Sequence, residues 1–345
     1  MKTMNELKKL AKEKVTKCRV CPVCNGLACR GEIPGVGGKG SGSTFVRNVE
    51  QLKHIKIKMD VTCGAIVPDT SSELFGKKVA LPVYAAPIAG ITNNFGAEIS
   101  DEQYTCDILD GCIQAKTIGF TGDGKFLEMF TGPLDMIDQR AGQGIATMKP
   151  WVKEGIDLRL EALLSRQVMA LATDIDSAGL PLLRNSEIPV ETKSVESLRY
   201  LKQALNVPLI VKGIMTVESA LRAKEAGADA IVVSNHGGRV LDETLSTIEV
   251  LEEIVQAVGN EMTVLVDGGF RTGHDVFKAL ALGADGVLIG RPVSLAAIGA
   301  GAQGVADYFE NIRKELADVM LMSGCAALND ITRDKIVVVK NEKIC

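Results

Sequence analysis

Short apolar runs alternate with helical patterns from about residue 80 onward, and this alternation limits the fold more than any other feature of the chain. The segments between the runs, such as 218–225, 246–258 and 274–282, carry apolar residues at helical spacing. Strands separated by helices form parallel sheets, because each helix returns the chain to the same end of the sheet. The runs predict eight strands, over residues 79–86, 113–118, 144–148, 168–172, 209–212, 230–234, 263–267 and 286–289.

Eight such units predict an α/β fold, a closed (β/α)8 TIM barrel over residues 79–345. The alternative is an open doubly wound sheet, whose dinucleotide-binding form carries G-x-G-x-x-G after a strand and an acidic residue downstream. No predicted strand is followed by this pattern. Residues 1–78 combine a predicted helix (4–17), a cysteine-rich segment and the glycine-rich stretch 35–42. We interpret them as an N-terminal helical, Cys-rich extension that covers the barrel.

Composition excludes several classes of protein. The chain has 345 residues, of which 46% are hydrophobic and 24% charged, an ordinary balance for a soluble enzyme. Its net charge of −4 provides no electrostatic footprint for nucleic acid. No apolar run reaches the ~18 residues that a membrane span needs. The lysine-rich N-terminus lacks the apolar segment of a secretory signal. We therefore expect a cytoplasmic protein that neither binds nucleic acid nor spans a membrane.

The segment Ser234-Asn235-His236-Gly237-Gly238-Arg239 follows a predicted buried strand and contains one of only three histidines. A strand that opens into a glycine turn can hold His236 where the backbone approaches a ligand. Arg239 supplies a forked cation suited to a carboxylate. A base beside a carboxylate clamp is the minimum equipment for removing a proton next to a carboxyl group.

Other strand ends add charged groups at the end of a barrel where active sites form. Lys212 could stabilise an anion there, or extend as an ordinary strand-end lysine. Asp267 could orient a cofactor chain or cap its turn. The loops after the last two strands combine glycine amides with Arg271 and Arg291, at the position where barrel enzymes often bind phosphate.

Residues 196–333 resemble the C-terminal half of the FMN-dependent α-hydroxy acid oxidase and dehydrogenase family, which includes glycolate oxidase and lactate oxidase. Isopentenyl diphosphate isomerase, a related FMN barrel, lacks the histidine–arginine pair, so that pair discriminates. The resemblance is carried by the segments 209–213, 234–239, 266–269, 275–284 and 289–292.

The resemblance implies a role for each matching residue. His236 looks like the base that takes the substrate proton while a hydride passes to flavin N5, and Arg239 like the carboxylate clamp. Lys212 looks like the cation near flavin N1 and O2, and Asp176 like the residue that orients the histidine. The implied FMN contacts are Ala86, Pro87, Ile88, Ala89, Lys149, Lys212, Ser234, Asp267, Gly268, Gly269, Arg271, Gly290 and Arg291.

The N-terminal half departs from the family on the substrate side. A cysteine segment replaces the family's tyrosine that holds the carboxylate, and Lys149 and Trp151 stand where the family has glutamine and tyrosine. The lid segment is short, so Arg184 is the one counterpart of a second substrate arginine. The implied substrate contacts are therefore His236, Arg239, Trp151 and Arg184. We expect a 2-hydroxy acid or related α-substituted acid, not glycolate or lactate bound in the usual way.

Four of the nine cysteines, Cys18, Cys21, Cys24 and Cys29, form the pattern C-x2-C-x2-C-x4-C. This density suits a tetrahedral zinc or an iron–sulfur cluster, and the spacing is close to the bacterial ferredoxin run. The pattern does not choose between these two, and reactive or packed thiols are the alternative. In a chain without a secretory signal we expect reduced thiols, not disulfides.

The favoured function is FMN-dependent oxidation of a 2-hydroxy acid to the 2-oxo acid, which makes the chain an oxidoreductase. The alternatives are a non-redox FMN enzyme of the isomerase kind and a flavin or metal redox sensor with its cysteines as the switch. His236, Arg239 and Lys212 together favour the oxidoreductase, because a sensor needs no base and clamp. The electron acceptor, oxygen or another, stays open. The resemblance implies a homo-tetramer or larger assembly.

Overall fold

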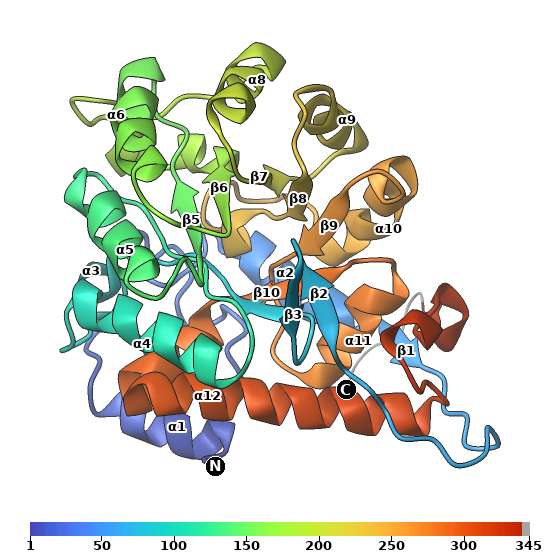
Figure 1. The fold of residues 1–345 in the computed structure, drawn as a ribbon. Helices are drawn as coiled ribbons and strands as arrows, with labels where there is room; N and C mark the ends of the chain where they lie inside the picture. The colour runs from blue at the N-terminus through green and yellow to red at the C-terminus, as the bar shows by residue number, and fades with distance from the viewer. Residues whose placement is uncertain (340–345) are drawn as a thin grey trace.

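Seven parallel strands form the centre of the structure, a computed structural model that describes residues 1–339. They are hydrogen-bonded in the order β4-β10-β9-β8-β7-β6-β5, and Figure 1 shows helices around the outside of the sheet. The strands are β4 (Val83–Ala85), β5 (Ile145–Met148), β6 (Ala170–Asp174), β7 (Leu209–Ile214), β8 (Ala230–Val233), β9 (Thr263–Val266) and β10 (Gly286–Ile289).

The predicted strand over 113–118 is wrong. Helix α4 (Asp101–Gln114) includes its first two residues, because Ser100 caps the helix and the chain stays helical to Gln114. The place between the two edge strands is taken instead by Gly119 and Phe120. The Phe120 N–H donates to the Ala85 carbonyl at 3.0 Å, and the Ile145 N–H donates to the Gly119 carbonyl at 3.0 Å. These two residues connect β4 with β5, so the sheet curls into a barrel-like shape.

The helices that follow the strands lie where the sequence predicts them. The predicted helices 218–225, 246–258 and 274–282 correspond to α9, α10 and α11, and each begins behind a Ser or Thr cap. The helices of this outer layer are α5 (Glu128–Asp138), α6 (Lys153–Leu164), α8 (Val195–Ala204), α9 (Val217–Glu225), α10 (Thr247–Val258), α11 (Gly273–Ala281) and α12 (Arg291–Met322).

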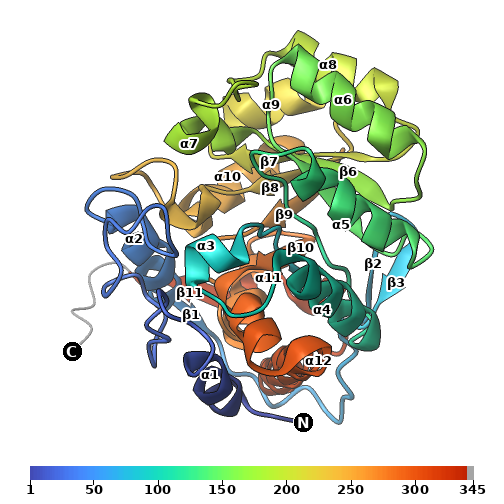
Figure 2. The ribbon, with the colours of Figure 1, turned by 90° about the vertical axis from the view of Figure 1, so that its left-hand side faces the viewer.

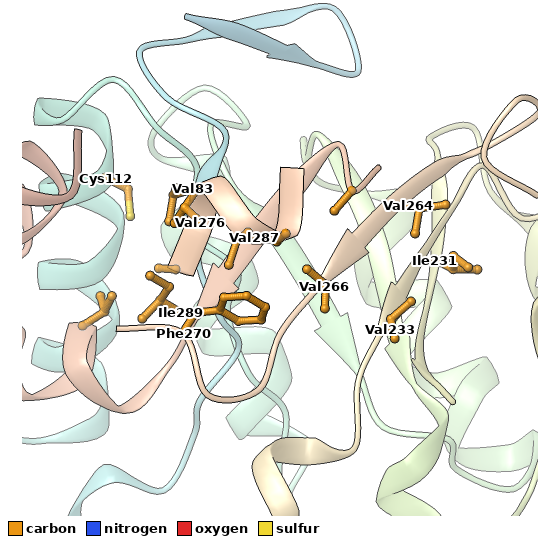
Figure 3. Packing of buried hydrophobic residues seen from close by; sticks show 14 of the residues in the cluster. Val83, Cys112, Ile231, Val233, Val264, Val266, Phe270, Val276, Val287 and Ile289 are labelled. Atoms are coloured by element: carbon orange, nitrogen blue, oxygen red, sulfur yellow. The ribbon is translucent and has the colours of Figure 1, made fainter. Parts of the chain in front are cut away.

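Alternation along each strand divides the apolar core into two layers. One layer lies between sheet and helices: Val264 and Val266 of β9 pack in the same cluster as Phe270 and Val276 (Figure 3). The other fills the space inside the curled sheet. Its residues come from alternate strand positions and are buried: Tyr84, Phe120, Ile145, Ala170, Ala172, Ile210, Ala230, Val232, Leu265 and Leu288. The inside of the sheet is therefore a packed core, and only its ends are open to ligands.

The first 78 residues wrap around the barrel. The predicted helix 4–17 ends earlier, as α1 (Met4–Lys12), and buries Leu7 and Ala11 beside α12 (Figures 1 and 2). α2 (Ser43–Lys53) packs against the turn that contains His236. The remaining elements are β1 (Ile55–Ile57), which pairs with β11 (Ile336–Val338), the hairpin β2 (Ser72–Leu74) and β3 (Lys77–Val79), and the short helices α3 (Ile91–Phe95) and α7 (Pro181–Arg184). None of the helices in residues 1–339 is both long and apolar enough for a membrane span.

Candidate active site

Four adjacent strands bring charged side chains to the carboxyl end of the sheet. These strands are β6, β7, β8 and β9. Asp174, His236 and Asp267 stand at or just beyond the ends of β6, β8 and β9, and Lys212 lies two residues before the end of β7. The next 3-10 turn, η1 (Ile175–Gly179), carries Asp176 directly against β7. A Cβ at Gly213 would lie 2.8 Å from the Asp176 Cβ, and Gly213 has a φ of 107°. Glycine at this position allows the close approach that puts Asp176 in the site.

His236 occupies a turn with an unusual backbone. Its φ is 57°, a left-handed conformation that non-glycine residues seldom adopt, and Gly237 and Gly238 also have positive φ. The side chain of Asn235 accepts a hydrogen bond from the Gly238 N–H at 3.2 Å. Its amide also exchanges hydrogen bonds of 2.8 and 2.9 Å with that of Asn48 in α2. This network fixes the turn and, with it, the direction of the imidazole.

The imidazole of His236 is paired with a buried carboxylate. Nδ1 lies 2.9 Å from Asp176 Oδ1 and 3.9 Å from Asp174 Oδ2. Burial, and then the positive charges of Lys212 and Lys149, hold the pKa of His236 well below its ordinary value of 6.5. The imidazole is therefore neutral at neutral pH, with the Nδ1 proton assigned to the hydrogen bond with Asp176 and Nε2 left as a base.

Lys212 is a buried cation within the same group. Its Nζ donates to Ser234 Oγ at 2.9 Å and lies 3.3 Å from Asp267 Oδ2. Burial acts to lower the pKa of Lys212, but the carboxylates around it, Asp267 first and then Asp176, raise that pKa above the ordinary value. Lys212 therefore stays charged. A fixed cation at this point stabilises negative charge that forms on a bound group.

Lys149 provides a second cation, but with a partner that the sequence analysis did not assign. Its Nζ lies 2.8 Å from Asp174 Oδ2 and 2.9 Å from Ser177 Oγ. The Lys149 side chain is only 11% exposed. Asp174 therefore links two predicted site residues, since it also lies near His236. The signal for it was in the sequence: Asp174 and Asp176 stand two apart at the end of one strand.

Arg239 is held by the N-terminal part of the chain. Its Nη2 donates to the Gly35 carbonyl at 2.8 Å and to Asn94 Oδ1 at 3.0 Å. Its Nε is buried and has no hydrogen-bond partner. Burial lowers the pKa of Arg239, but a guanidinium stays charged under all physiological conditions. Nη2 of Arg239 is thus anchored to the protein, whereas Nε is left to bind a ligand.

Trp151, which the resemblance implies as a substrate contact, is held by buried protein partners. The indole is buried, donates its N–H to Asp123 Oδ2 at 2.7 Å and stacks on the Arg159 guanidinium at 4.3 Å. Asp123 also accepts a hydrogen bond from the Lys149 backbone N–H at 2.9 Å. Asp123 therefore supports the loop that carries Lys149. The indole N–H of Trp151 is already donated to Asp123. Arg184 is exposed at the end of α7.

Arg271 and Arg291 contact the N-terminal segment. Arg271 donates to the Cys24 carbonyl from Nε at 3.2 Å and from Nη2 at 3.0 Å. Arg291 donates from Nε to the Val36 carbonyl at 2.8 Å, and its guanidinium lies 3.8 Å from the centre of the Phe45 ring. Burial lowers the pKa of Arg291 to about 10. The loops after β9 and β10 are thus covered by residues from the first 45 positions.

Comparison with known proteins now identifies the family. The profile of FMN-dependent dehydrogenases matches residues 36–101 and 159–338. The chain belongs to this family. It is 48% identical over 339 residues to a peroxisomal (S)-2-hydroxyacid oxidase of Arabidopsis thaliana, with 89% of this chain and 92% of the relative covered. It is 32% identical over 342 residues to the 4-hydroxymandelate oxidase of Amycolatopsis orientalis, with 89% and 95% covered.

Solved structures agree with this membership. A lactate oxidase structure from Pediococcus acidilactici superposes with a TM-score of 0.81 at 26% identity, covering 99% of this chain and 96% of that one. A mandelate oxidase bound to (S)-2-phenylpropionate superposes with a TM-score of 0.74 at 27% identity, covering 96% and 97%. The relatives thus share the barrel-like fold, and the chain is an oxidoreductase of the FMN-dependent family.

The buried polar atoms of this family member fit a cofactor with both hydrogen-bond donors and acceptors. Buried polar atoms nearly always have partners in proteins. Among the described residues, five side-chain atoms are buried without one: Tyr84 Oη, Thr147 Oγ1, Asp176 Oδ2, Arg239 Nε and Asp267 Oδ1. Three of them belong to the charged group around His236. Thr147 lies two residues after Ile145 and so on the same, inward face of β5. Tyr84 lies beside Gly286 at the start of β10, away from the charged group. The other four atoms lack partners within the protein, and FMN offers them ring carbonyls, a ring N–H and ribityl hydroxyls.

The predicted FMN segments lie at the same end of the barrel. Ala86 to Ala89 follow β4 and are half-buried, and the Ala86 N–H donates to the Ile289 carbonyl at 3.0 Å. A Cβ on Gly290 would lie 3.2 Å from Ile88 Cδ1. Gly269, with a φ of 95°, accommodates the close approach of Asn48, whose carbonyl oxygen would lie 2.2 Å from a Cβ there. Position 269 therefore requires glycine, both for its positive φ and for the close approach of Asn48.

The four N-terminal cysteines of this family member gather in one place. Cys18, Cys21, Cys24 and Cys29 are half-buried, free of disulfides, and line a single cavity with Arg291. Burial first, and then the neighbouring thiols, raise the pKa of Cys18 to about 11. The sequence predicted reduced thiols, and the described cysteines are all free. The segment lies outside the residues that the family profile matches.

Proposed function

We propose that the chain oxidises a 2-hydroxy acid, or a related α-substituted acid, to the 2-oxo acid, with His236 as the base. The observation that carries this proposal is the neutral imidazole of His236, paired with Asp176, at the same buried end of the barrel as the unpartnered Nε of Arg239. A hydroxy acid needs both: a cation for its carboxylate and a base for its hydroxyl. Relatives named as oxidases of 2-hydroxy acids, 4-hydroxymandelate and lactate support this choice of substrate class.

The residues divide the reaction between them. Arg239 binds the substrate carboxylate through its free Nε and turns the substrate so that its hydroxyl faces His236. Nε2 of His236 removes the hydroxyl proton. The imidazolium that forms is stabilised by the carboxylates of Asp176 and Asp174. FMN, when bound, supplies the two-electron acceptor for the hydrogen on the substrate's α-carbon.

FMN would be held by residues at or near the ends of six strands, β4, β5, β7, β8, β9 and β10. Lys212, charged and buried, would lie near the ring edge that gains negative charge, and Asp267 Oδ1 would accept from a ribityl hydroxyl. We assign the phosphate to the loops after β9 and β10, where Arg271 and Arg291 supply positive charge. The remaining proposed FMN contacts are Ala86, Pro87, Ile88, Ala89, Lys149, Ser234, Gly268, Gly269 and Gly290.

Residues 1–78 complete this site and do not form a separate domain in our proposal. Gly35 anchors Arg239, Asn48 braces the His236 turn, and Val36 anchors Arg291. These contacts support an extension that closes the mouth of a barrel over residues 79–345. We further propose a cytoplasmic enzyme that assembles as a homo-tetramer or larger.

The substrate class is tested by measuring product. Purified, FMN-loaded enzyme is incubated with an artificial electron acceptor and a panel of acids, and the 2-oxo acid is quantified. We expect one 2-oxo acid for each two electrons accepted with at least one larger 2-hydroxy acid, and poor turnover of glycolate and lactate. Absence of any 2-oxo acid across the panel, from protein that contains FMN, would contradict the proposal.

The pH dependence of kcat/KM follows from the pKa of His236. The reaction needs the neutral imidazole, and that pKa lies below 6.5 in the folded protein. The acid limb of the profile should therefore lie below pH 6.5, with activity lost as the pH falls through the folded pKa.

Lys149→Met should move this limb to higher pH. The change removes a cation that lowers the His236 pKa and leaves the Asp174 carboxylate without its ion pair, and both effects raise that pKa. Lys153→Met, at a highly exposed lysine in α6, is the control and should leave the limb in place. If the acid limb of Lys149→Met stays at the wild-type pH or moves to lower pH, this electrostatic account is rejected.

A further inference from the structure

The four cysteines of residues 18–29 are reactive groups that the proposed reaction does not use. They come from a segment of bends and turns with no helix or strand of its own. All four line one cavity of about 30 Å³, together with Phe45, Phe95 and Leu295. By the same measure a single water molecule needs ~10–15 Å³. The four thiols therefore line one small cavity, with room for about two water molecules.

The backbone of this segment is fixed by the rest of the protein. The Cys18 N–H donates to the Phe95 carbonyl at 3.1 Å, and the Cys24 carbonyl accepts both hydrogen bonds from Arg271. The Cys29 carbonyl would lie 1.9 Å from a Cβ at position 37, so only glycine fits there. Gly37 belongs to the glycine-rich stretch 35–42, which thus packs closely against the end of the cysteine segment.

Positive charge surrounds the thiols. Arg271 Nη2 lies 3.8 Å from Cys24 Sγ, and Arg291 lines the cavity. Lys8 of α1 donates from Nζ to the Pro22 carbonyl at 2.7 Å, within the same segment. Thiolates are the form in which cysteine binds metal, and nearby cations stabilise them. Four thiolates around an iron–sulfur core carry net negative charge, which these three cations offset.

The positions of the sulfurs do not match a single zinc ion. A zinc ion holds four thiolates at ~2.3 Å in a tetrahedron, which places neighbouring sulfurs about 3.8 Å apart. In residues 1–339, the set of three or more ligand atoms that lie within 4.8 Å of one another is Asp174, Asp176 and His236, not the cysteines. A [4Fe–4S] core binds its thiolates through different irons and so needs them further apart.

We propose that Cys18, Cys21, Cys24 and Cys29 bind a [4Fe–4S] iron–sulfur cluster. The sequence spacing, the shared cavity, the fixed backbone and the surrounding cations all support this site. It lies beside Arg271 and Arg291, on the loops to which we assign the FMN phosphate, so the two cofactors would be neighbours. The cluster site itself does not depend on the proposed function, because none of its evidence concerns His236, Arg239 or the substrate.

The test is the metal content of the full-length protein purified without air. Iron, zinc and acid-labile sulfide are measured per chain, FMN is measured separately, and electron paramagnetic resonance is recorded after reduction with dithionite. We expect about four irons and four sulfides per chain, with broad visible absorption beyond the flavin bands. Zinc in place of iron, or FMN-loaded protein without iron and sulfide, would overturn the cluster while leaving the oxidation proposal intact.

Matched variants assign the ligands. Cys21→Ser and Cys24→Ser should lose most of the iron and sulfide, whereas Cys63→Ser, at an exposed cysteine outside the segment, should keep both. Equal iron in all three variants overturns the assignment. If the serine variants are insoluble, wild-type protein is stripped with a chelator and reconstituted with iron and sulfide. One sample of the stripped protein is reconstituted directly, and a second is reconstituted after its thiols have been alkylated. Recovery of the cluster spectrum in the first sample alone supports the site. Equal recovery in both samples rejects it.

Discussion

His236→Asn should lower kcat/KM by about 100- to 10,000-fold, the usual contribution of a positioned general base. Asparagine keeps a similar polar side chain in the turn but cannot take a proton. The loss should appear in kcat, because the base acts on the bound substrate in the transition state. Steady-state kinetics with the preferred acid and an artificial acceptor measure it.

FMN content and binding of a 2-oxo acid product are the controls for this variant. Both should stay near wild type, because Lys212, Asp267 and Arg239 are unchanged. Asp176→Asn should give a smaller loss and move the pH profile, since Asp176 positions the imidazole without touching the substrate. A His236→Asn enzyme with wild-type kcat would remove the histidine from the mechanism.

Arg239→Met should lower kcat/KM by about 30- to 5,000-fold, which corresponds to the 2–5 kcal/mol typical of a truncated buried charge partner. The variant loses the nitrogen that faces the ligand and leaves the substrate carboxylate unpaired in a buried site. KM should rise as well, in contrast to His236→Asn, because the carboxylate is already bound in the ground state.

Arg239→Lys separates charge from geometry. Lysine restores a positive charge but not the fork that anchors one nitrogen on Gly35 and Asn94 while leaving another free. We expect partial recovery, between the methionine variant and wild type. If Arg239→Met binds and oxidises the acid as wild type does, the carboxylate clamp lies elsewhere.

The C-terminal half of the barrel could be predicted closely because each of its strands is a continuous apolar run that can be recognised without its neighbours. Residues 230–233, for example, are four apolar residues with both faces buried, and a glycine turn follows. The second strand position could not be found in this way. Gly119 and Phe120 make only two bridges, too few to produce a period, and Ile113, which suggested a strand, ends a helix.

The site residues also differ in whether the sequence could predict them. His236, Arg239, Lys212 and Asp267 follow strands that the sequence reveals, so their convergence could be predicted. The partners of Arg239 could not be predicted, because Gly35 and Asn94 lie 204 and 145 residues away in the sequence. Gly35 is in a loop and Asn94 is in the five-residue helix α3, which is too short to show a period. Trp151 as a substrate contact stays a prediction from the resemblance. Its indole partners could not be predicted either: the N–H donates to Asp123, which pairs with Arg159.

Anaerobic stopped-flow reduction of the bound flavin tests the central claim most directly. Wild-type enzyme mixed with its preferred 2-hydroxy acid should lose the flavin's visible absorption in a fast phase and form one equivalent of 2-oxo acid. His236→Asn, with the same FMN content, should stay yellow over that time and bleach at least about 100-fold more slowly. Bleaching of His236→Asn at the wild-type rate, or no bleaching of wild type by any 2-hydroxy acid, would contradict the account.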